Sequence, residues 1–175
     1  MRLIMVLVLC VFELHAASKT SIQTDNADYD GKQIHMVGAV HIQHEFGNLT
    51  CDKGVLVMKE KGQSRLDPDR IFLYGSVAVV LHDGSILTSE EADINCETLE
   101  GVFTATPPNK VVYVTRVEEG DKAVPVKTMS RCMRVTMKRQ SGQAAGQKSQ
   151  YVIQDVQAEG AVQIEYQQEH EKESP

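Results

Sequence analysis

The stretch "IHMVGAVHI" (34–42) alternates apolar and polar side chains around a central glycine, and the chain contains a similar stretch twice more. "IFLYGSVAVV" begins at residue 71 and "VQAEGAVQI" begins at residue 156, and in all three the glycine follows four positions after the first residue. Alternation with a period of two is typical of β-strands, because successive side chains point to opposite faces. A glycine inside a strand marks a bend or a close approach to the backbone. We therefore expect three copies of one bent strand.

The apolar face has the same phase relative to the glycine in the first and last copies, and this phase predicts which side chains point inward. The middle copy is apolar on both faces, so its inward face follows from the phase of the other two. The predicted inward residues are Ile34, Met36, Val40 and Ile42, then Ile71, Leu73, Val77 and Val79, and finally Val156, Ala158, Val162, Ile164 and Tyr166.

A second element follows the first two copies at a matching distance, as "GNLTCDKGVLV" (47–57) and "GSILTSEEADI" (84–94). Leu56 aligns with Ile94, and both are expected to point inward. The odd separation of Leu49 and Leu56 would place them on opposite faces of a regular strand, so we expect a bulge between them. The stretch "TMSRCMRV" (128–135) is a third, more degraded version. A hairpin of about 37 residues cannot bury one face alone, so the copies should stack.

Residues 1–17 have the order of a secretory signal peptide. Arg2 precedes the apolar run "LIMVLVLCVF" (3–12), and small residues follow at Ala16 and Ala17. A membrane-spanning helix needs about twenty apolar residues, so we expect cleavage near Ala17 and export. The alternative is that residues 3–14 remain as a membrane anchor.

Residues 18–166 carry almost no helical period and predict one all-β domain, with short apolar runs that end at turn residues. The segment 138–150 has no large apolar side chain and predicts a flexible loop. The polar tail 167–175 is expected to be disordered. The net charge is −6, and without clustered Lys and Arg it does not favour nucleic-acid binding.

The mature chain would keep Cys51, Cys96 and Cys132. An oxidising compartment would permit one disulfide and leave one thiol, and the sequence does not choose the pair. The three cysteines have no CxxC spacing, so the sequence does not indicate a zinc site. We interpret the histidines of "HIQHE" (41–45) as surface residues and "SEEAD" (89–93) as a solvated turn. No catalytic motif is recognisable, so the sequence predicts neither an enzyme nor a cofactor.

The residues resemble the OstA-like domain of the LptA family, which comprises periplasmic lipopolysaccharide-transport proteins. The resemblance lies in "ADYDGKQIHMVGAV" (27–40), "NLTCDKGVLV" (48–57), "DRIFLYGSVAVV" (69–80) and "ILTSEEADINCETLEGVF" (86–103). It rests on the order and spacing of these segments and covers about residues 20–166. It implies an open, V-shaped antiparallel β-jelly roll with an apolar interior. The cysteines and the segment 138–150 depart from the pattern.

The resemblance also implies a function: the interior would shelter the acyl chains of lipopolysaccharide on the way from the inner to the outer membrane. Partners would be other OstA-like domains, LptC-like and LptD-like, with head-to-tail self-assembly. Two alternatives stay open, an anchored LptC-like component and a structural β-repeat envelope protein with a filled core. The predicted lipid-binding residues are Ile34, Met36, Val40, Ile42, Leu56, Ile71, Leu73, Val77, Val79, Ile94, Val156, Val162 and Ile164.

Overall fold

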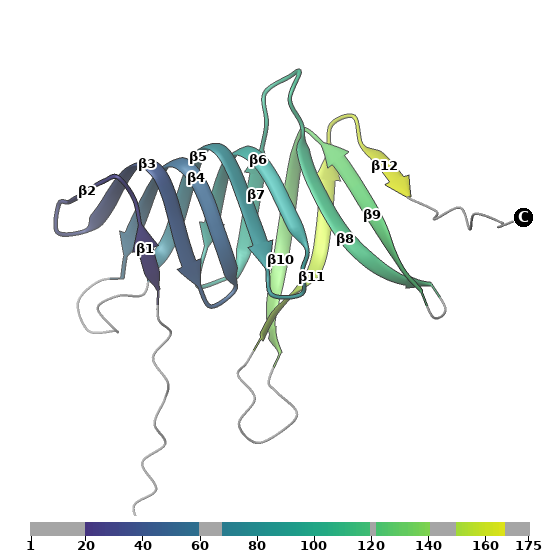
Figure 1. Ribbon diagram of the computed structural model, residues 1–175, viewed down its shortest axis with the longest axis horizontal. Helices are drawn as coiled ribbons and strands as arrows, with labels where there is room; N and C mark the ends of the chain where they lie inside the picture. The colour runs from purple at the N-terminus through teal and green to yellow at the C-terminus, as the bar shows by residue number, and fades with distance from the viewer. Residues whose placement is uncertain (1–19, 60–67, 120–121, 141–149, 167–175) are drawn as a thin grey trace, which may run out of the picture.

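The computed structural model describes residues 20–59, 68–119, 122–140 and 150–166, and the regular structure in these ranges is entirely β. The described strands form one antiparallel sheet of twelve strands. They succeed one another along the long axis of the molecule (Figure 1). The expected all-β, open and antiparallel architecture is confirmed. The described residues contain no helix with the length and apolar character to cross a membrane. The strands are β1 (Ser21–Gln23), β2 (Asn26–Tyr29), β3 (Gln33–His44), β4 (Gly47–Met58), β5 (Pro68–Leu81), β6 (Ile86–Asn95), β7 (Glu100–Thr104), β8 (Val111–Glu119), β9 (Lys122–Ser130), β10 (Cys132–Gln140), β11 (Gln150–Glu159) and β12 (Gln163–Tyr166).

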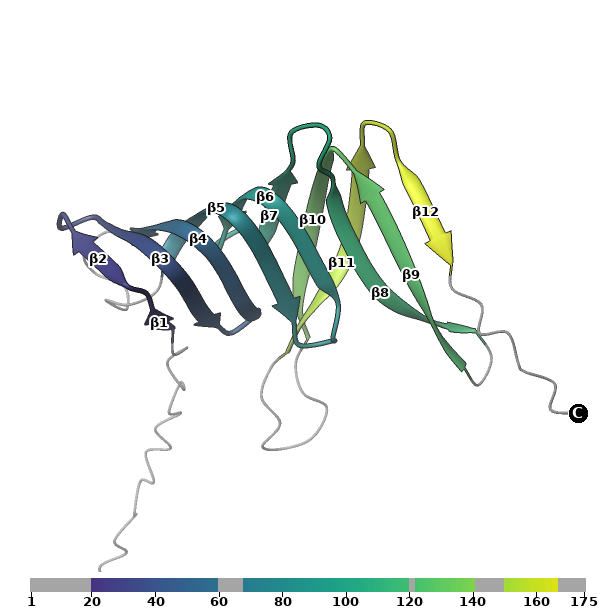
Figure 2. The same cartoon turned by 45° about the horizontal axis from the view of Figure 1, so that its top comes forward.

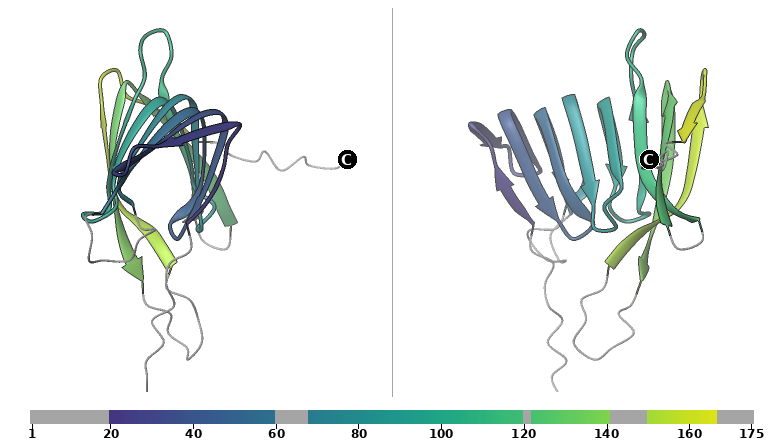
Figure 3. Two further views of the ribbon diagram at one scale, coloured as in Figure 1. Left: turned by 90° about the vertical axis from the view of Figure 1, so that its left-hand side faces the viewer. Right: turned by 45° about the vertical axis from the view of Figure 1, so that its right-hand side comes forward.

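The sheet forms two walls of a trough. Strands β3 to β6 bend in the middle and run through both walls. Beyond them the sheet divides, because one end of β6 pairs with β7 and the other end pairs with β8. Strands β7, β10 and β11 continue the first wall, the β11 wall, and strands β8, β9 and β12 continue the second, the β12 wall (Figure 2). The end-on view in Figure 3 shows the two walls arching from a common ridge.

The repeated glycines form this ridge. Gly38, Gly75 and Gly160 have φ angles of +83°, +72° and +77°, and the residue after each glycine also has a positive φ. A glycine adopts this left-handed conformation without a steric penalty. At the first two glycines the β-ladder shifts register, so that the glycine strand carries one residue more than its neighbour. Such a bulge bends the strand, and the predicted bend is confirmed.

The bulge also explains the odd spacing of Leu49 and Leu56. The register of β4 against β5 shifts between Thr50 and Lys53, which reverses the side-chain phase in the middle of β4. Both leucines are therefore buried, as the sequence predicted.

Inward side chains line up in rows that cross the strands. In the β11 wall one row places Gly54, Ala92 and Ala158 next to larger residues, so that neighbouring side chains interlock. The row in the β12 wall is mainly aliphatic, and together the rows supply most of the buried core. The two rows of the β11 wall are Met36, Gly54, Leu73, Ala92, Phe103, Met133 and Ala158, and Ile34, Leu56, Ile71, Ile94, Gly101, Val135 and Val156. The row of the β12 wall is Ile22, Ile42, Leu49, Val79, Leu87, Tyr113, Thr128 and Ile164.

Three features differ from the sequence expectations. The polar stretch "SIQTDNADYD" (21–30) carries none of the predicted strand copies, yet it forms β1 and β2 against β3. The last copy is not one strand, because its bend at Gly160 divides it into β11 and β12. Both ends of the predicted loop 138–150 belong to strands, since β10 extends to Gln140 and β11 begins at Gln150. The predicted signal peptide (1–17), residues 141–149 and the predicted disordered tail (167–175) lie outside the described ranges.

Candidate functional site: the apolar trough

The structure brings most of the predicted lining residues together on the inner face. Ile34 and Val156 are partly buried and pack against the core. Val162 and Ile164 are 47% and 52% exposed, and they lie at the edge of the β12 wall, where β12 pairs only with β9. The other nine are buried in one core: Met36, Val40, Ile42, Leu56, Ile71, Leu73, Val77, Val79 and Ile94.

The part of the trough near the N-terminal strands is filled by its own side chains. A Cβ atom added to Gly54 would lie 2.8 Å from the Cε atom of Met36, and one added to Gly101 would lie 2.8 Å from the ring of Phe103. These small residues on the inner face are therefore the spaces into which the larger side chains fit. This half of the trough is closed in the structure.

The other end of the trough is open. Val117, Ile164 and Tyr166 lie on the same inner face as the core residue Tyr113, as the register of β8, β9 and β12 shows. Their exposed fractions are 49%, 52% and 68%. The C-terminal end of the β12 wall therefore presents an apolar inner surface to solvent, which we call the open face and define by Val117, Ile164 and Tyr166.

A contact across the mouth of the trough was not predicted. The turn between β3 and β4 lies at the rim of the β12 wall, and the start of β11 lies at the rim of the β11 wall. The Tyr151 hydroxyl donates a hydrogen bond of 2.5 Å to the Glu45 carboxylate. The Phe46 ring lies between the rings of His44 and Tyr151, at centroid distances of 4.2 Å and 6.4 Å.

This cluster corrects one sequence interpretation. His41 is exposed, as expected, but His44 is buried against Phe46. The alternation of β3 places the two histidines on opposite faces, so that only one of them can be a surface residue. Burial and the hydrogen bond to the Glu45 carboxylate together raise the pKa of Tyr151 to about 12. No sequence pattern could have paired two residues that lie 106 positions apart.

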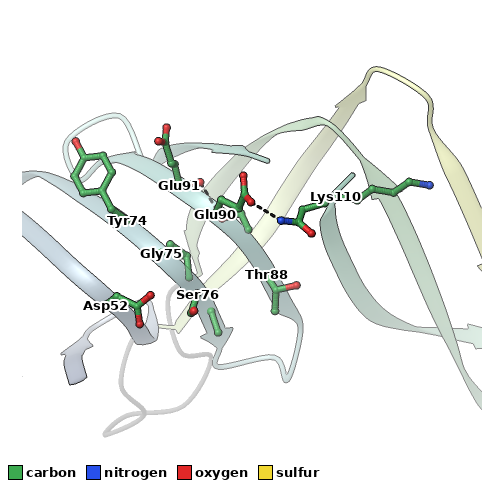
Figure 4. Close-up of a pocket in the computed structure, with 12 residues that line it drawn as sticks. Asp52, Tyr74, Gly75, Ser76, Thr88, Glu90, Glu91 and Lys110 are labelled. Carbon is green, nitrogen blue, oxygen red and sulfur yellow. Dashed lines mark hydrogen bonds between the residues drawn. The ribbon is translucent and has the colours of Figure 1, made fainter. Parts of the chain in front are cut away.

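A surface cavity of about 750 Å³ lies on the outer side of the ridge, next to Gly75 (Figure 4). It is lined by Asp52, Glu90, Glu91 and Lys110 among others. The Glu90 carboxylate accepts hydrogen bonds from the Thr106 amide at 2.6 Å and from the Asn109 side chain at 2.5 Å. Its carboxylate is therefore engaged in holding the loop between β7 and β8.

The acidic stretch around Glu90 lies within strand β6, so the interpretation of 89–93 as a solvated turn is wrong. The repeat aligns the stretch 89–93 with the middle of β4, so both copies of this element are strands. The hydrogen bonds from Thr106 and Asn109 lower the pKa of Glu90, and Asp93 forms an ion pair of 2.6 Å with Arg70. Among the residues that the structure describes, no three His, Cys, Asp or Glu side chains are placed to hold a metal ion.

In the part of the chain that the structure describes, Cys51, Cys96 and Cys132 form no disulfide. Cys51 points into the trough beside Val40 and is buried, with its Sγ atom 3.0 Å from the Lys53 carbonyl oxygen. Burial raises the pKa of Cys51 to about 11. A neutral thiol in this position behaves as a small apolar core residue.

Comparison with known proteins identifies a solved structure with a similar fold. No known sequence family matches this chain, and no curated protein matches it. Among solved structures the chain is similar to LptH of Pseudomonas aeruginosa, described as the LptA-homologous periplasmic component of the conserved lipopolysaccharide transport device. The TM-score is 0.51 at 11% sequence identity, over 78% of this chain and 96% of that chain. The chain therefore has an LptA-like fold.

Proposed function

We propose that this protein is a periplasmic carrier that shelters lipopolysaccharide acyl chains in its trough during transport from the inner to the outer membrane. The observation that carries the proposal is the continuity of the inner face. Apolar rows run from strand to strand along the trough and end on the open face. Burial of an acyl chain contributes about 0.8 kcal/mol per CH₂ group, which favours a long apolar surface. The LptA-like fold supports both the cargo and the periplasmic location.

The open face is where acyl chains would first make contact. Val117, Ile164 and Tyr166 are exposed here, whereas the inner residues near the N-terminal strands are covered. An acyl chain bound to the open face would continue the row that runs through Tyr113 and Leu87. The thirteen predicted lining residues would then contact the cargo in two stages, with Ile164 and Val162 before the buried set.

The edges of the sheet support assembly with further OstA-like domains, LptC-like and LptD-like, and with other copies of this chain. Among the described strands, β11 and β12 each pair with a single neighbour, and so do β1 and β2. β11 and β12 run in the same direction as β3, which pairs antiparallel with β1 and β2. The β1 and β2 strands of a second copy would therefore continue the antiparallel order in both walls.

The filled N-terminal half favours one other function, that of a structural β-repeat protein of the envelope whose interior is only core. The two functions differ in the open face, which a structural protein would not need. An anchored form, with residues 3–14 retained, differs only outside the described residues, and sequencing the mature N-terminus would identify it.

Photo-crosslinking in intact envelopes tests the proposed cargo. A photoreactive residue at Val117 or Ile164 should capture lipopolysaccharide. Matched controls are their neighbours Arg116 and Gln163, which point to the outer face and are also exposed. Equal capture at all four positions would contradict the lining, and capture at none of them would favour the structural alternative.

A further inference from the structure

The rims of the two walls meet where the β3–β4 turn contacts the start of β11. Four strands separate β4 from β11 in the sheet, namely β5, β6, β7 and β10. The contact therefore crosses the mouth of the trough instead of following the sheet. Figure 3 (left) shows the first residues of β11 below the opening of the arch.

The contact is small, polar at its centre and sealed by aromatic rings. It consists of the hydrogen bond from Tyr151 to Glu45 and the edge-on contact of the Tyr151 and Phe46 rings. Phe46 is 1% exposed and Tyr151 is 5% exposed. The rings thus exclude solvent from the trough beneath them.

Breaking this contact would leave the sheet intact. No β-ladder joins β11 to β3 or β4, so the rims can separate without the loss of a strand-to-strand hydrogen bond. The walls are held by continuous ladders on both sides of the ridge. A hydrogen bond and a ring contact between otherwise independent rims have the properties of a reversible closure.

We propose that Glu45, Phe46 and Tyr151 form a latch that keeps the N-terminal half of the trough shut, and that cargo enters this half only while the latch is open. The inference rests on the proposed function, because it assigns the latch to the same trough. It accounts for the filled core beside an open face. In this half of the trough the apolar lining is covered by its own side chains.

Cys51 reports directly on opening of the latch, because its thiol is buried inside the trough. The reference protein would carry Ser at Cys10, Cys96 and Cys132, so that Cys51 is its single thiol. Its alkylation by N-ethylmaleimide would be measured in native buffer at one fixed pH. Tyr151→Phe and Glu45→Ala both remove the hydrogen bond to a charged group and should raise the rate about tenfold. Glu45→Gln keeps an acceptor oxygen but loses the charge, so it should raise the rate less, by about threefold.

Low concentrations of urea distinguish opening from global unfolding. Alkylation through a local opening should change little with urea, because little surface becomes exposed, whereas alkylation through unfolding should rise steeply. An unchanged rate in both Tyr151→Phe and Glu45→Ala would overturn the latch. A raised rate with steep urea dependence would overturn it as well.

Photo-crosslinking to lipopolysaccharide separates the latch from the proposed cargo. In the Tyr151→Phe protein, capture at Met36 should increase several-fold, while capture at Ile164 on the open face should stay unchanged. Capture at Ile164 without any increase at Met36 would overturn the role of the latch in cargo entry. If the rate of Cys51 alkylation rises but neither Met36 nor Ile164 captures lipopolysaccharide, the latch closes the trough but the proposed cargo is wrong.

Discussion

The carboxylate of Asp52 occupies the space that a side chain at Gly75 would need. Asp25 has the same relation to Gly38, and Arg131 has a looser version of it with Gly160. Each repeated glycine therefore meets two demands, a left-handed backbone and a charged residue packed against it, which lies in β4 for Gly75 and in the short connections before β2 and β10 for Gly38 and Gly160. This pairing is the reason that the short strand motif recurs along the chain with its glycine in a constant place.

Replacing Gly75 by Ala should destabilise the protein more than replacing Gly84 by Ala. Both glycines have φ angles near +75°, at +72° and +81°, so the backbone strain of about 1–2 kcal/mol is common to both variants. Nothing lies within 4 Å of a Cβ at Gly84, whereas a Cβ at Gly75 would collide with Asp52. We expect an additional loss of about 1–3 kcal/mol for Gly75→Ala, measured by urea unfolding. Equal losses in the two variants would show that the carboxylate moves aside without cost.

The repeats made much of this fold predictable. Periodicity identified the inward residues of β3 and β5, and the odd spacing of Leu49 and Leu56 identified the bulge in β4. These signals are local, because a strand's phase and its bend are set by neighbouring residues. The same reasoning could not recognise β1 and β2, whose side chains are mostly polar and exposed.

The sequence did not reveal that β7 and β8 together correspond to another copy of the repeated bent strand. Here the loop 105–110 stands in place of the glycine bend, and Glu90 holds that loop through Thr106 and Asn109. The contact between Glu45 and Tyr151 was beyond sequence reasoning for another reason. It depends on the distance between the rims of the two walls, and a single sequence does not indicate that distance.

Replacing Ile42 by Asp should severely destabilise the protein. Ile42 is buried in the row of the β12 wall between Ile22 and Leu49, so a carboxylate there would lose its hydration without gaining a partner. We expect a loss of at least about 3 kcal/mol by urea unfolding. His41→Asp is the matched control on the exposed face and should change stability by less than about 0.5 kcal/mol. A stable, fully folded Ile42→Asp protein would contradict the assignment of this face to the interior.

The stability of the protein should fall between pH 9 and pH 11 because of Cys51. Its pKa is about 11 in the folded protein and 9.0 ordinarily, so the folded state favours the neutral thiol. The stabilisation is complete below pH 9 and is lost as the pH rises through 11, since the unfolded chain releases the proton first. Each pKa unit corresponds to about 1.4 kcal/mol. Cys51→Ala should flatten this part of the pH profile, measured by chemical unfolding at each pH, and an unchanged slope would show that Cys51 does not cause it.

Head-to-tail assembly predicts a specific register between two copies. Ile164 and Ile22 both lie in the row of the β12 wall, at its two ends. If a second copy continues the sheet, its Ile22 should pair with Ile164 of the first copy, with Cα atoms about 4.5–5.5 Å apart. This separation suits a disulfide. One protein with Ile164→Cys and another with Ile22→Cys, both with Ser at the four native cysteines, should therefore form a mixed disulfide dimer on mild oxidation.

The control for this register is Gln23→Cys in place of Ile22→Cys, because Gln23 points to the opposite face of β1. It should form little disulfide with Ile164→Cys. Replacing Gln157 by Pro should also reduce the yield, since proline at the free edge of β11 places a ring without an N–H group beside the incoming strand. Equal dimer yields from Ile22→Cys and Gln23→Cys would mean that the two edges meet without a fixed register. In that case the apolar rows of successive copies would not be aligned, and acyl chains could not pass along a continuous lining. A single dominant dimer from Ile22→Cys would mean that the open face of one copy leads directly onto β1 of the next.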